Sequence, residues 1–189
     1  MVLCQKTNLN FLLIQIKNYQ FKKNIVQKTV QENSLNDLKI VLNKVCQLTN
    51  FSYGEIWLPN EESDFLEISP NYYVVADRHQ LDFQLFHECS QGFIMSKGEG
   101  LPGRVFKSEK PEWMLDVSVE SENSFLRNKI AGICGVKTGF AIPIIKEKKV
   151  LAVLAFFSRD IRSVSPEQLA LAKDFAMKSL TLSSSFNNN

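Results

Sequence analysis

The sequence of 189 residues is poor in the residues that build metal centres and cross-linked folds. It has two histidines and four cysteines, and the cysteines form no CxxC pair and no ligand spacing with a histidine that is typical of metal sites. The cysteines are Cys4, Cys46, Cys89 and Cys134. We therefore expect buried free thiols rather than a secreted disulfide framework, and neither a metal nor a cofactor.

Long hydrophobic runs and a strong charge of one sign are also missing. The longest apolar stretches, around Leu12 and from Val150 to Phe157, fall short of the roughly 20 residues that cross a bilayer. Lys and Arg number 22 against 20 Asp and Glu, which leaves a formal charge of +2 and disfavours an obligate nucleic-acid binder. We expect no membrane span, no nucleic-acid partner and a cytoplasmic location.

The composition does support one folded domain with a long end. Hydrophobic residues make up 44% of the chain, enough for a core that needs no disulfide or metal. Residues 1–33 are interpreted as an N-terminal extension, because their lysines come without arginine or a clear cleavage site; a targeting segment is the alternative. We expect the domain over residues 34–182 and a disordered tail over residues 183–189.

Apolar spacing predicts the order helix, two strand regions, helix, glycine-rich turn, strand, helix, hairpin, helix. The segments that carry these predictions are a helix from the cap Ser34, strands over Phe51 to Leu58 and Phe65 to Val75 with an irregularity at Pro70-Asn71, a helix over Asp82 to Cys89, the turn from Lys97, a strand over Trp113 to Leu115, a helix over Ser124 to Ile133, a hairpin of Gly139 to Ile145 with Val150 to Phe157, and a helix from Ser165. Regular crossover helices are lacking. The sequence therefore predicts an α+β fold with a mostly antiparallel sheet, and its first and last helices on one face.

Several of these segments resemble a GAF domain, the small-molecule sensor module of signalling proteins. The run from Gly98 to Phe106, followed by Pro111-Glu112-Trp113, is similar to the segment that enters the pocket-lining helix and continues to the next strand. Phe140 to Ile144 and Val150 to Phe157 are similar to the final hairpin. The resemblance covers about Leu35 to Leu182. It implies a six-stranded antiparallel sheet with helices on both sides, a ligand cavity on one face, and a regulatory role without catalysis.

The resemblance also implies which residues and partners to examine. Segments that face the cavity in the family supply the candidate pocket residues Trp113, Asp116, Phe125, Ile130 and Phe140. The expected partners are an unknown small-molecule ligand, a second copy of the chain through the terminal helices, and a separate output protein. The helical stripe of Leu35, Leu38, Leu42 and Val45 either forms the dimer seam or packs on the sheet, and the sequence leaves both open.

Two other classes in the family depend on particular residues. A bilin-binding photoreceptor would place a cysteine and a histidine near Leu126-Arg127, and a free methionine sulfoxide reductase would need thiols near Leu101 and Gly132. Neither set is present. Cys89 and Cys134 remain for a thiol-dependent enzyme if they meet in space, but the sequence shows no base to activate them. Both classes stay as alternatives to the sensor.

The two histidines, His79 and His87, are spaced too widely to share a metal. On one continuous helix, eight residues would separate them by about 12 Å along the axis. Either one alone would suit a haem iron. We favour structural or surface roles for both.

Overall fold

The computed structural model describes residues 35–60, 64–163 and 165–186. The chain divides into a short N-terminal unit, Met1–Asn36, and a main unit, Asp37–Asn189, and the fold below is that of the main unit. The predicted extension over residues 1–33 and the predicted cap Ser34 lie outside the described residues. The last helix continues to Phe186, into the segment predicted as a tail.

Six strands form one sheet in which every neighbouring pair is antiparallel. The strands are β1 (Tyr53–Pro59), β2 (Phe65–Val74), β3 (Ile94–Ser96), β4 (Glu112–Met114), β5 (Gly139–Lys146) and β6 (Lys149–Phe157). Their order across the sheet is β3-β2-β1-β6-β5-β4, so β1 lies between β2 and β6. The predicted hairpin is β5 and β6, and Glu147 and Lys148 turn between them with positive φ angles.

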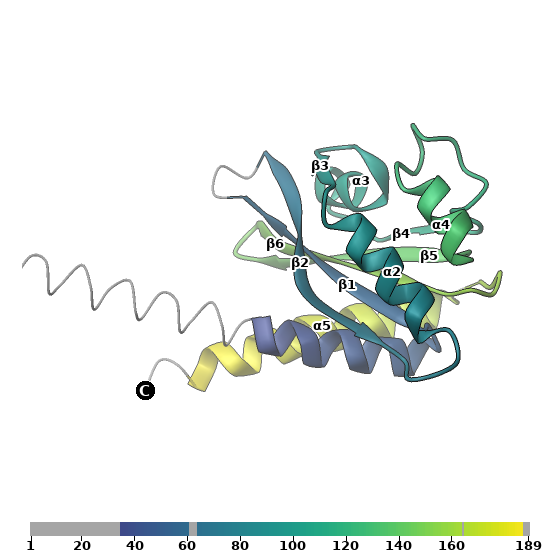
Figure 1. Cartoon of the computed structure of the whole chain (residues 1–189). Coiled ribbons are helices and arrows are strands. Elements are labelled where there is room, and N and C mark those ends of the chain that lie inside the picture. Colours follow the sequence, from purple (N-terminus) through teal and green to yellow (C-terminus); the bar gives the residue numbers. More distant parts are fainter. Residues whose placement is uncertain (1–34, 61–63, 164, 187–189) are drawn as a thin grey trace, which may run out of the picture. The chain divides into compact units, whose positions relative to one another are not determined.

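Helices cover both faces of this sheet (Figure 1). They are a first helix over residues 35–49, α2 (Gln80–Ser90), α3 (Gly100–Ser108), α4 (Asn128–Cys134) and α5 (Pro166–Phe186). The first helix and α5 lie side by side on one face, which we call the terminal-helix face; α2, α3 and α4 lie over the other, the lid face. The predicted α+β fold, with a six-stranded antiparallel sheet between helices, is confirmed.

Alternation along β1 explains why a central strand is buried on both sides. Tyr53, Glu55 and Trp57 point to the lid face. Tyr53 and Trp57 belong to the main apolar cluster on that face. Gly54 points to the terminal-helix face, where a Cβ atom would lie 3.1 Å from the Leu42 side chain. Leu42 is fully buried, so the predicted leucine stripe packs within the chain.

The structure confirms one predicted irregularity and differs from the predicted elements in two places. β2 is one continuous strand that includes Pro70. It contains the predicted irregularity as a bulge, in which the three residues Ser69 to Asn71 lie opposite the single residue Ile56 of β1. β3 was not predicted, because three residues carry too little periodicity. The helix predicted from Ser124 begins at Asn128, since turns occupy the residues before it.

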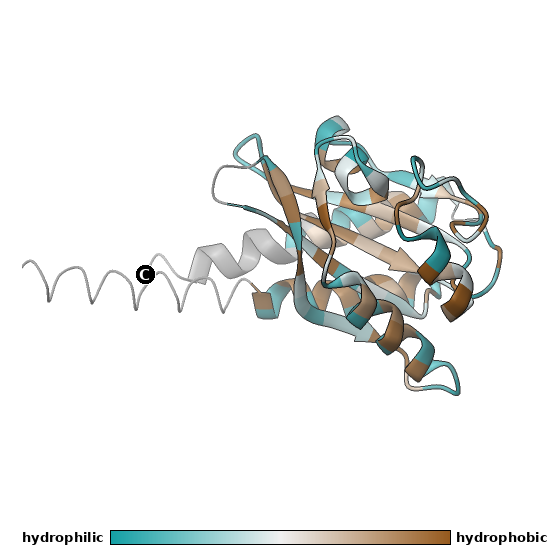
Figure 2. Ribbon diagram, turned by 45° about the horizontal axis from the view of Figure 1, so that its top comes forward, coloured by the Kyte–Doolittle hydropathy of each residue, from teal (hydrophilic) through white to brown (hydrophobic). Residues whose placement is uncertain are grey.

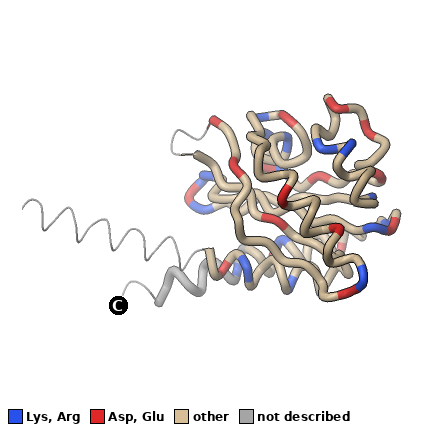
Figure 3. The backbone as a smooth tube through the Cα atoms, viewed as in Figure 1, with Lys and Arg blue, Asp and Glu red and all other residues tan. Residues whose placement is uncertain are grey.

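The distribution of apolar and charged residues in the main unit agrees with the balanced composition. Brown, apolar segments lie along the strands in Figure 2, and acidic and basic residues are interspersed in Figure 3. In the described ranges, no helix combines the length and apolar character that a bilayer span requires.

Candidate functional site

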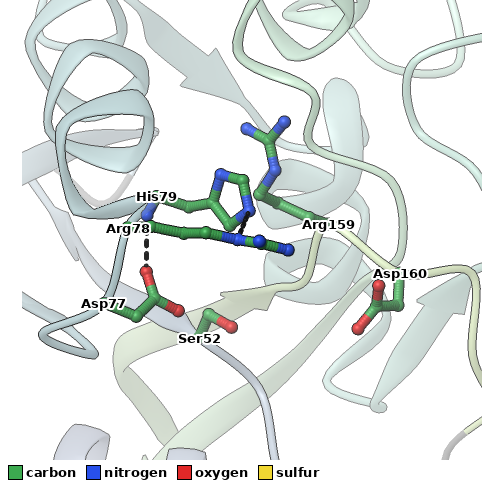
Figure 4. Close-up of a pocket in the computed structure, with 6 residues that line it drawn as sticks. All are labelled: Ser52, Asp77, Arg78, His79, Arg159 and Asp160. Carbon is green, nitrogen blue, oxygen red and sulfur yellow. Dashed lines mark hydrogen bonds between the residues drawn. The ribbon is translucent and has the colours of Figure 1, made fainter.

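Three polar features stand out, two of them hollows at opposite ends of the sheet. The first hollow, of about 610 Å³, lies where β1 begins and β6 ends (Figure 4). Its lining residues are Ser52, Asp77, Arg78, His79, Arg159 and Asp160. We call it the β1-end hollow.

The charged residues that line the β1-end hollow all have hydrogen-bond or ion-pair partners. Asp77 Oδ1 accepts the His79 backbone N–H at 2.7 Å, and Arg78 Nε donates to His79 Nε2 at 3.0 Å. The His79 proton is therefore on Nδ1, which donates to Asp82 Oδ2 at 3.2 Å. Arg159 Nη1 donates to the same Asp82 oxygen at 2.6 Å. These contacts tie the start of α2 to the end of β6.

The second hollow, also about 610 Å³, opens beside the glycine-rich turn. It lies between the residues that enter α3 and the loop that precedes α4, and we call it the lid hollow. Its lining residues are Ser96, Lys97, Gly98, Glu99, Glu122, Asn123 and Leu126. Gly98 and Gly100 have φ angles of 93° and 58°, and a methyl group at Gly103 would collide with the Ser96 carbonyl oxygen. This turn needs glycine because its backbone is left-handed and tightly packed.

The third feature is an ion pair buried on the lid face, between β1 and α4. Arg127 and Glu55 have side chains with 0% exposure. Arg127 Nη2 donates to Glu55 Oε1 at 2.6 Å, and Nη1 donates to Oε2 at 3.0 Å and to Ser90 Oγ at 2.8 Å. Trp57 Nε1 donates to Glu55 at 2.7 Å. The carboxylate therefore has the several hydrogen bonds that a buried charge requires.

A buried tyrosine and histidine extend this network to α2. Tyr53 donates its hydroxyl proton to Glu55 Oε2 at 2.9 Å and lies 2.8 Å from His87 Nδ1. Because the hydroxyl has one proton, His87 must donate from Nδ1, and its Nε2 carries a lone pair. Burial lowers the pKa of His87, while burial and the neighbouring Glu55 raise the pKa of Tyr53.

Aromatic rings surround the guanidinium of Arg127. Its central carbon lies 4.8 to 5.4 Å from four ring centroids. The rings belong to Trp57, Phe86, Phe125 and Phe157. The carboxylate and the four rings together form what we call the cation box, because this is the chemistry that proteins use to bind organic cations.

The structure does not bring the five predicted pocket residues together. Phe125 lines the cation box and Ile130 packs against the same apolar cluster. Phe140 points to the terminal-helix face, where its ring stacks on that of Phe156 with 4.7 Å between the ring centroids. Trp113 lies opposite Phe140 in the β4–β5 pair, so it shares that face, and its side chain is 40% exposed. Because side chains alternate along a strand, the residues that precede and follow Trp113 in β4 and Phe140 in β5 point to the lid face instead.

Asp116, the remaining candidate, is engaged at the end of β4. It accepts bonds from Ser118 and forms an ion pair with Lys137 at 3.2 Å. Burial alone would raise its pKa, but these bonds and the lysine charge lower it. The assignment of all five residues as ligand contacts stays a prediction.

Sequence reasoning missed the residues of the buried network. Glu55 is a carboxylate inside an otherwise apolar strand, and that placement was the available signal. Arg127 was noted only because a bilin-binding photoreceptor would have a cysteine and a histidine near that position. Its partner on β1 is 72 residues away, and no local spacing relates the two.

The three cysteines that the structure describes give no sign of an activated thiolate, and one of them, Cys89, is not buried as we expected. Cys89 is exposed, whereas Cys46 and Cys134 are buried. Burial and the neighbouring Cys89 raise the pKa of Cys134. Among the residues that the structure describes, no group of three or more metal-binding side chains occurs.

Known proteins share this sequence pattern and fold. A family model described as "GAF domain" matches residues 38–178. Protein NLP3 of Arabidopsis thaliana is 25% identical over 158 residues, which cover 81% of this chain and 20% of NLP3. Transcription factor bHLH13 of the same plant is 34% identical over 62 residues, 33% of this chain and 10% of that protein. The chain thus spans a fifth or less of the curated relatives it matches.

Solved structures support the fold at low sequence identity. A GAF domain/HD domain protein from Geobacter sulfurreducens has a TM-score of 0.61 and 10% identity, over 80% of this chain and 92% of that one. The GAF domain of a two-component sensor histidine kinase from Bacillus halodurans has a TM-score of 0.58 and 16% identity, over 81% and 97%. Free methionine-R-sulfoxide reductase from Neisseria meningitidis scores 0.51 at 15% identity, over 74% and 72%.

Proposed function

Because the chain belongs to the GAF domain family, we propose that it is a regulatory sensor module that binds a small ligand on the lid face and does not catalyse a reaction. GAF domains are sensor and regulatory domains, and the match extends over residues 38–178. Ligand binding and output are the finer parts of the proposal. We place the module in the cytoplasm.

The observation that carries this proposal is the lid hollow, together with the buried ion pair that holds Arg127, the residue after Leu126. The hollow lies between the glycine-rich turn and the loop before α4, and Leu126 lines it. The next residue, Arg127, connects that loop to β1 and α2. A ligand that orders the loop would therefore act on the position of α4, through the difference in its affinity for the two arrangements.

The route from this site to an output runs through β1. Glu55 faces the lid and its neighbour Gly54 faces the terminal helices, where Leu42 packs on it. We propose that the terminal helices pass the signal to a second copy or to a separate output protein. The exposed Ile40 and Leu171 on these helices are available for such contacts. One relative is named a transcription factor, which supports a module that acts within a larger regulatory system.

Native mass spectrometry of the full chain purified from its own host tests the proposal. We expect a small molecule that is lost on denaturation, and a dimer if the terminal helices associate. Size-exclusion chromatography with light scattering checks the dimer separately, with Ile40→Lys as the variant that weakens it. A protein that carries no small molecule when freshly isolated contradicts the sensor proposal.

A thiol-dependent redox enzyme is the second candidate, because one fold neighbour is a sulfoxide reductase and Cys89 lies near Cys134. The raised pKa of Cys134 disfavours it, since the thiolate is the nucleophile. Turnover of free methionine sulfoxide with dithiothreitol, compared among the wild type, Cys89→Ser and Cys134→Ser, decides the matter. Activity that disappears with either cysteine would replace our proposal; activity that is absent or unchanged removes the enzyme.

A further inference from the structure

Arg127 sits in the cation box as a bound ligand would. Its guanidinium donates three hydrogen bonds, two to the Glu55 carboxylate and one to Ser90, and four aromatic rings surround it. The side chain has 0% exposure. A carboxylate inside a ring of aromatic side chains recognises guanidinium and ammonium groups.

The two halves of the ion pair differ in how firmly the fold holds them. Glu55 is in β1, which is hydrogen-bonded to β2 and β6, and the carboxylate also accepts protons from Trp57 and Tyr53. Arg127 is the N-cap residue of the seven-residue α4, at the end of an irregular loop. Leu126, beside it, lines the lid hollow. Arg127 is therefore the half that can leave, because the loop that carries it is held less firmly than β1.

Arg127 also fits the box imperfectly. Among the described residues, two buried atoms of the cluster lack hydrogen-bond partners: the donor Nε of Arg127 and the acceptor Nε2 of His87. His87 is 1% exposed, so bulk solvent does not reach this side chain. A buried polar atom without a partner is destabilising, because it has lost its hydrogen bonds to water and gained none in the protein. A cation that is not tethered to the backbone at Nε could turn a further N–H toward His87.

We propose that the cation box is the ligand site of this domain, that its ligand is a small organic cation with a guanidinium or ammonium group, and that Arg127 is the resident occupant that the ligand displaces. This inference rests on the proposed sensor function and gives its ligand a chemical class. Displacement frees α4 from β1 and α2, so occupancy and the position of α4 are coupled.

An anionic ligand is the opposite possibility, because it would pair with Arg127 and take the place of Glu55 in the ion pair. The contacts argue against it. An anion in the box would lie beside the Glu55 carboxylate, which β1 holds there through its unbroken pairing with β6, and two like charges close together repel strongly in a buried site. The electron-rich faces of four rings also disfavour negative charge.

The two tryptophans make the wild-type chain its own reporter. Trp57 donates its indole N–H to Glu55, whereas Trp113 is partly exposed on the other face of the sheet. Because the sequence has two tryptophans, a ¹⁵N-labelled full chain gives two indole signals, which Trp113→Phe assigns. We expect N-ethylguanidinium chloride at constant ionic strength to shift the Trp57 signal saturably and to leave the Trp113 signal in place. Neutral N-ethylurea and sodium acetate are the matched probes, and neither is expected to shift Trp57.

A variant without the resident occupant gives the second measurement. Arg127→Ala is expected to lower the melting temperature and to regain part of the loss with N-ethylguanidinium but not with N-ethylurea. Its half-saturating concentration should be at least about tenfold below that of the wild type, because no tethered side chain competes for the box. Adding Glu55→Gln should abolish the rescue. Arg104→Ala, which removes a partly exposed guanidinium from α3, is the control that the probe should not rescue.

The outcomes separate this inference from the sensor proposal. A Trp57 signal that ignores N-ethylguanidinium, or that responds equally to N-ethylurea or acetate, overturns the cation site. Rescue of Arg127→Ala without any response of the wild type also overturns it, because Arg127 is then a permanent structural residue. If Arg127→Ala does not fold, the wild-type titration alone decides. A neutral or anionic molecule found by native mass spectrometry leaves the sensor proposal standing and removes the cation site.

Discussion

Removing one partner of the buried ion pair should destabilise the fold far more than removing a surface charge. Arg127→Met keeps the length and much of the volume of the side chain, so packing against the four rings changes little. It removes three hydrogen bonds and leaves the Glu55 carboxylate buried with only the Trp57 and Tyr53 donors. An uncompensated buried charge costs about 3–5 kcal/mol in the free energy of unfolding.

The double variant separates the charge from the shape. Glu55→Gln alone should cost a similar amount, since it leaves the guanidinium unpaired. Glu55→Gln with Arg127→Met places two neutral side chains together, and we expect it to cost less than the sum of the single variants by at least about 3 kcal/mol.

Urea unfolding at neutral pH, followed by tryptophan fluorescence, measures all three variants, provided that the m-value stays constant. Lys129→Met, which removes an exposed lysine paired with Glu122, is the control and should leave the unfolding free energy unchanged. A coupling energy below about 0.5 kcal/mol would refute the reasoning, because it would mean that the pair behaves like an exposed one.

Three further predictions concern pH, packing and thiol reactivity. Since burial holds the pKa of His87 below its ordinary value of 6.5, the unfolded chain binds that proton more readily, so stability should fall as the pH drops below about 6.5; urea midpoints across this range should vary less with pH in His87→Gln than in the wild type. Gly103→Ala should cost about 1–3 kcal/mol because its methyl group meets a carbonyl oxygen, whereas Gly132→Ala, with nothing within 4 Å, should gain about 0.5–1 kcal/mol in the same assay. The exposed Cys89 should react rapidly with a disulfide reagent in the folded chain, and Cys89→Ser should lose one fast-reacting thiol; an unchanged count would contradict its exposure.

Much of the fold could be predicted because it is encoded locally. Strand periodicity gave the hairpin, and the glycine-rich turn marked the entry to α3. The helix predicted over Ser124 to Ile133 ends close to its predicted limit, because Gly135 terminates α4 with a φ angle of 67°. The family resemblance then supplied the number of strands and their antiparallel pairing. β3 could not be found this way, since its pairing with β2 depends on a neighbour that is distant in sequence.

The candidate site was much less predictable. Whether Phe125 or Phe140 faces the lid depends on strand register and on which helices cover which face, and aromatic residues fill both faces. The Glu55–Arg127 pair is a contact between residues with no local pattern in common. A charge in the middle of an apolar strand was the one warning that a partner had to exist.

The bulge in β2 has a consequence for how rigid the centre of the sheet can be. Where Ser69 to Asn71 oppose Ile56, the ladder between β1 and β2 is interrupted for one step, directly beside the residue that holds the carboxylate. On its other side β1 stays in unbroken register with β6. The strand thus has a stiff flank and a compliant flank. Any displacement of Glu55 would be taken up toward β2, so the hydrogen-exchange rates of that half of the molecule would report it first.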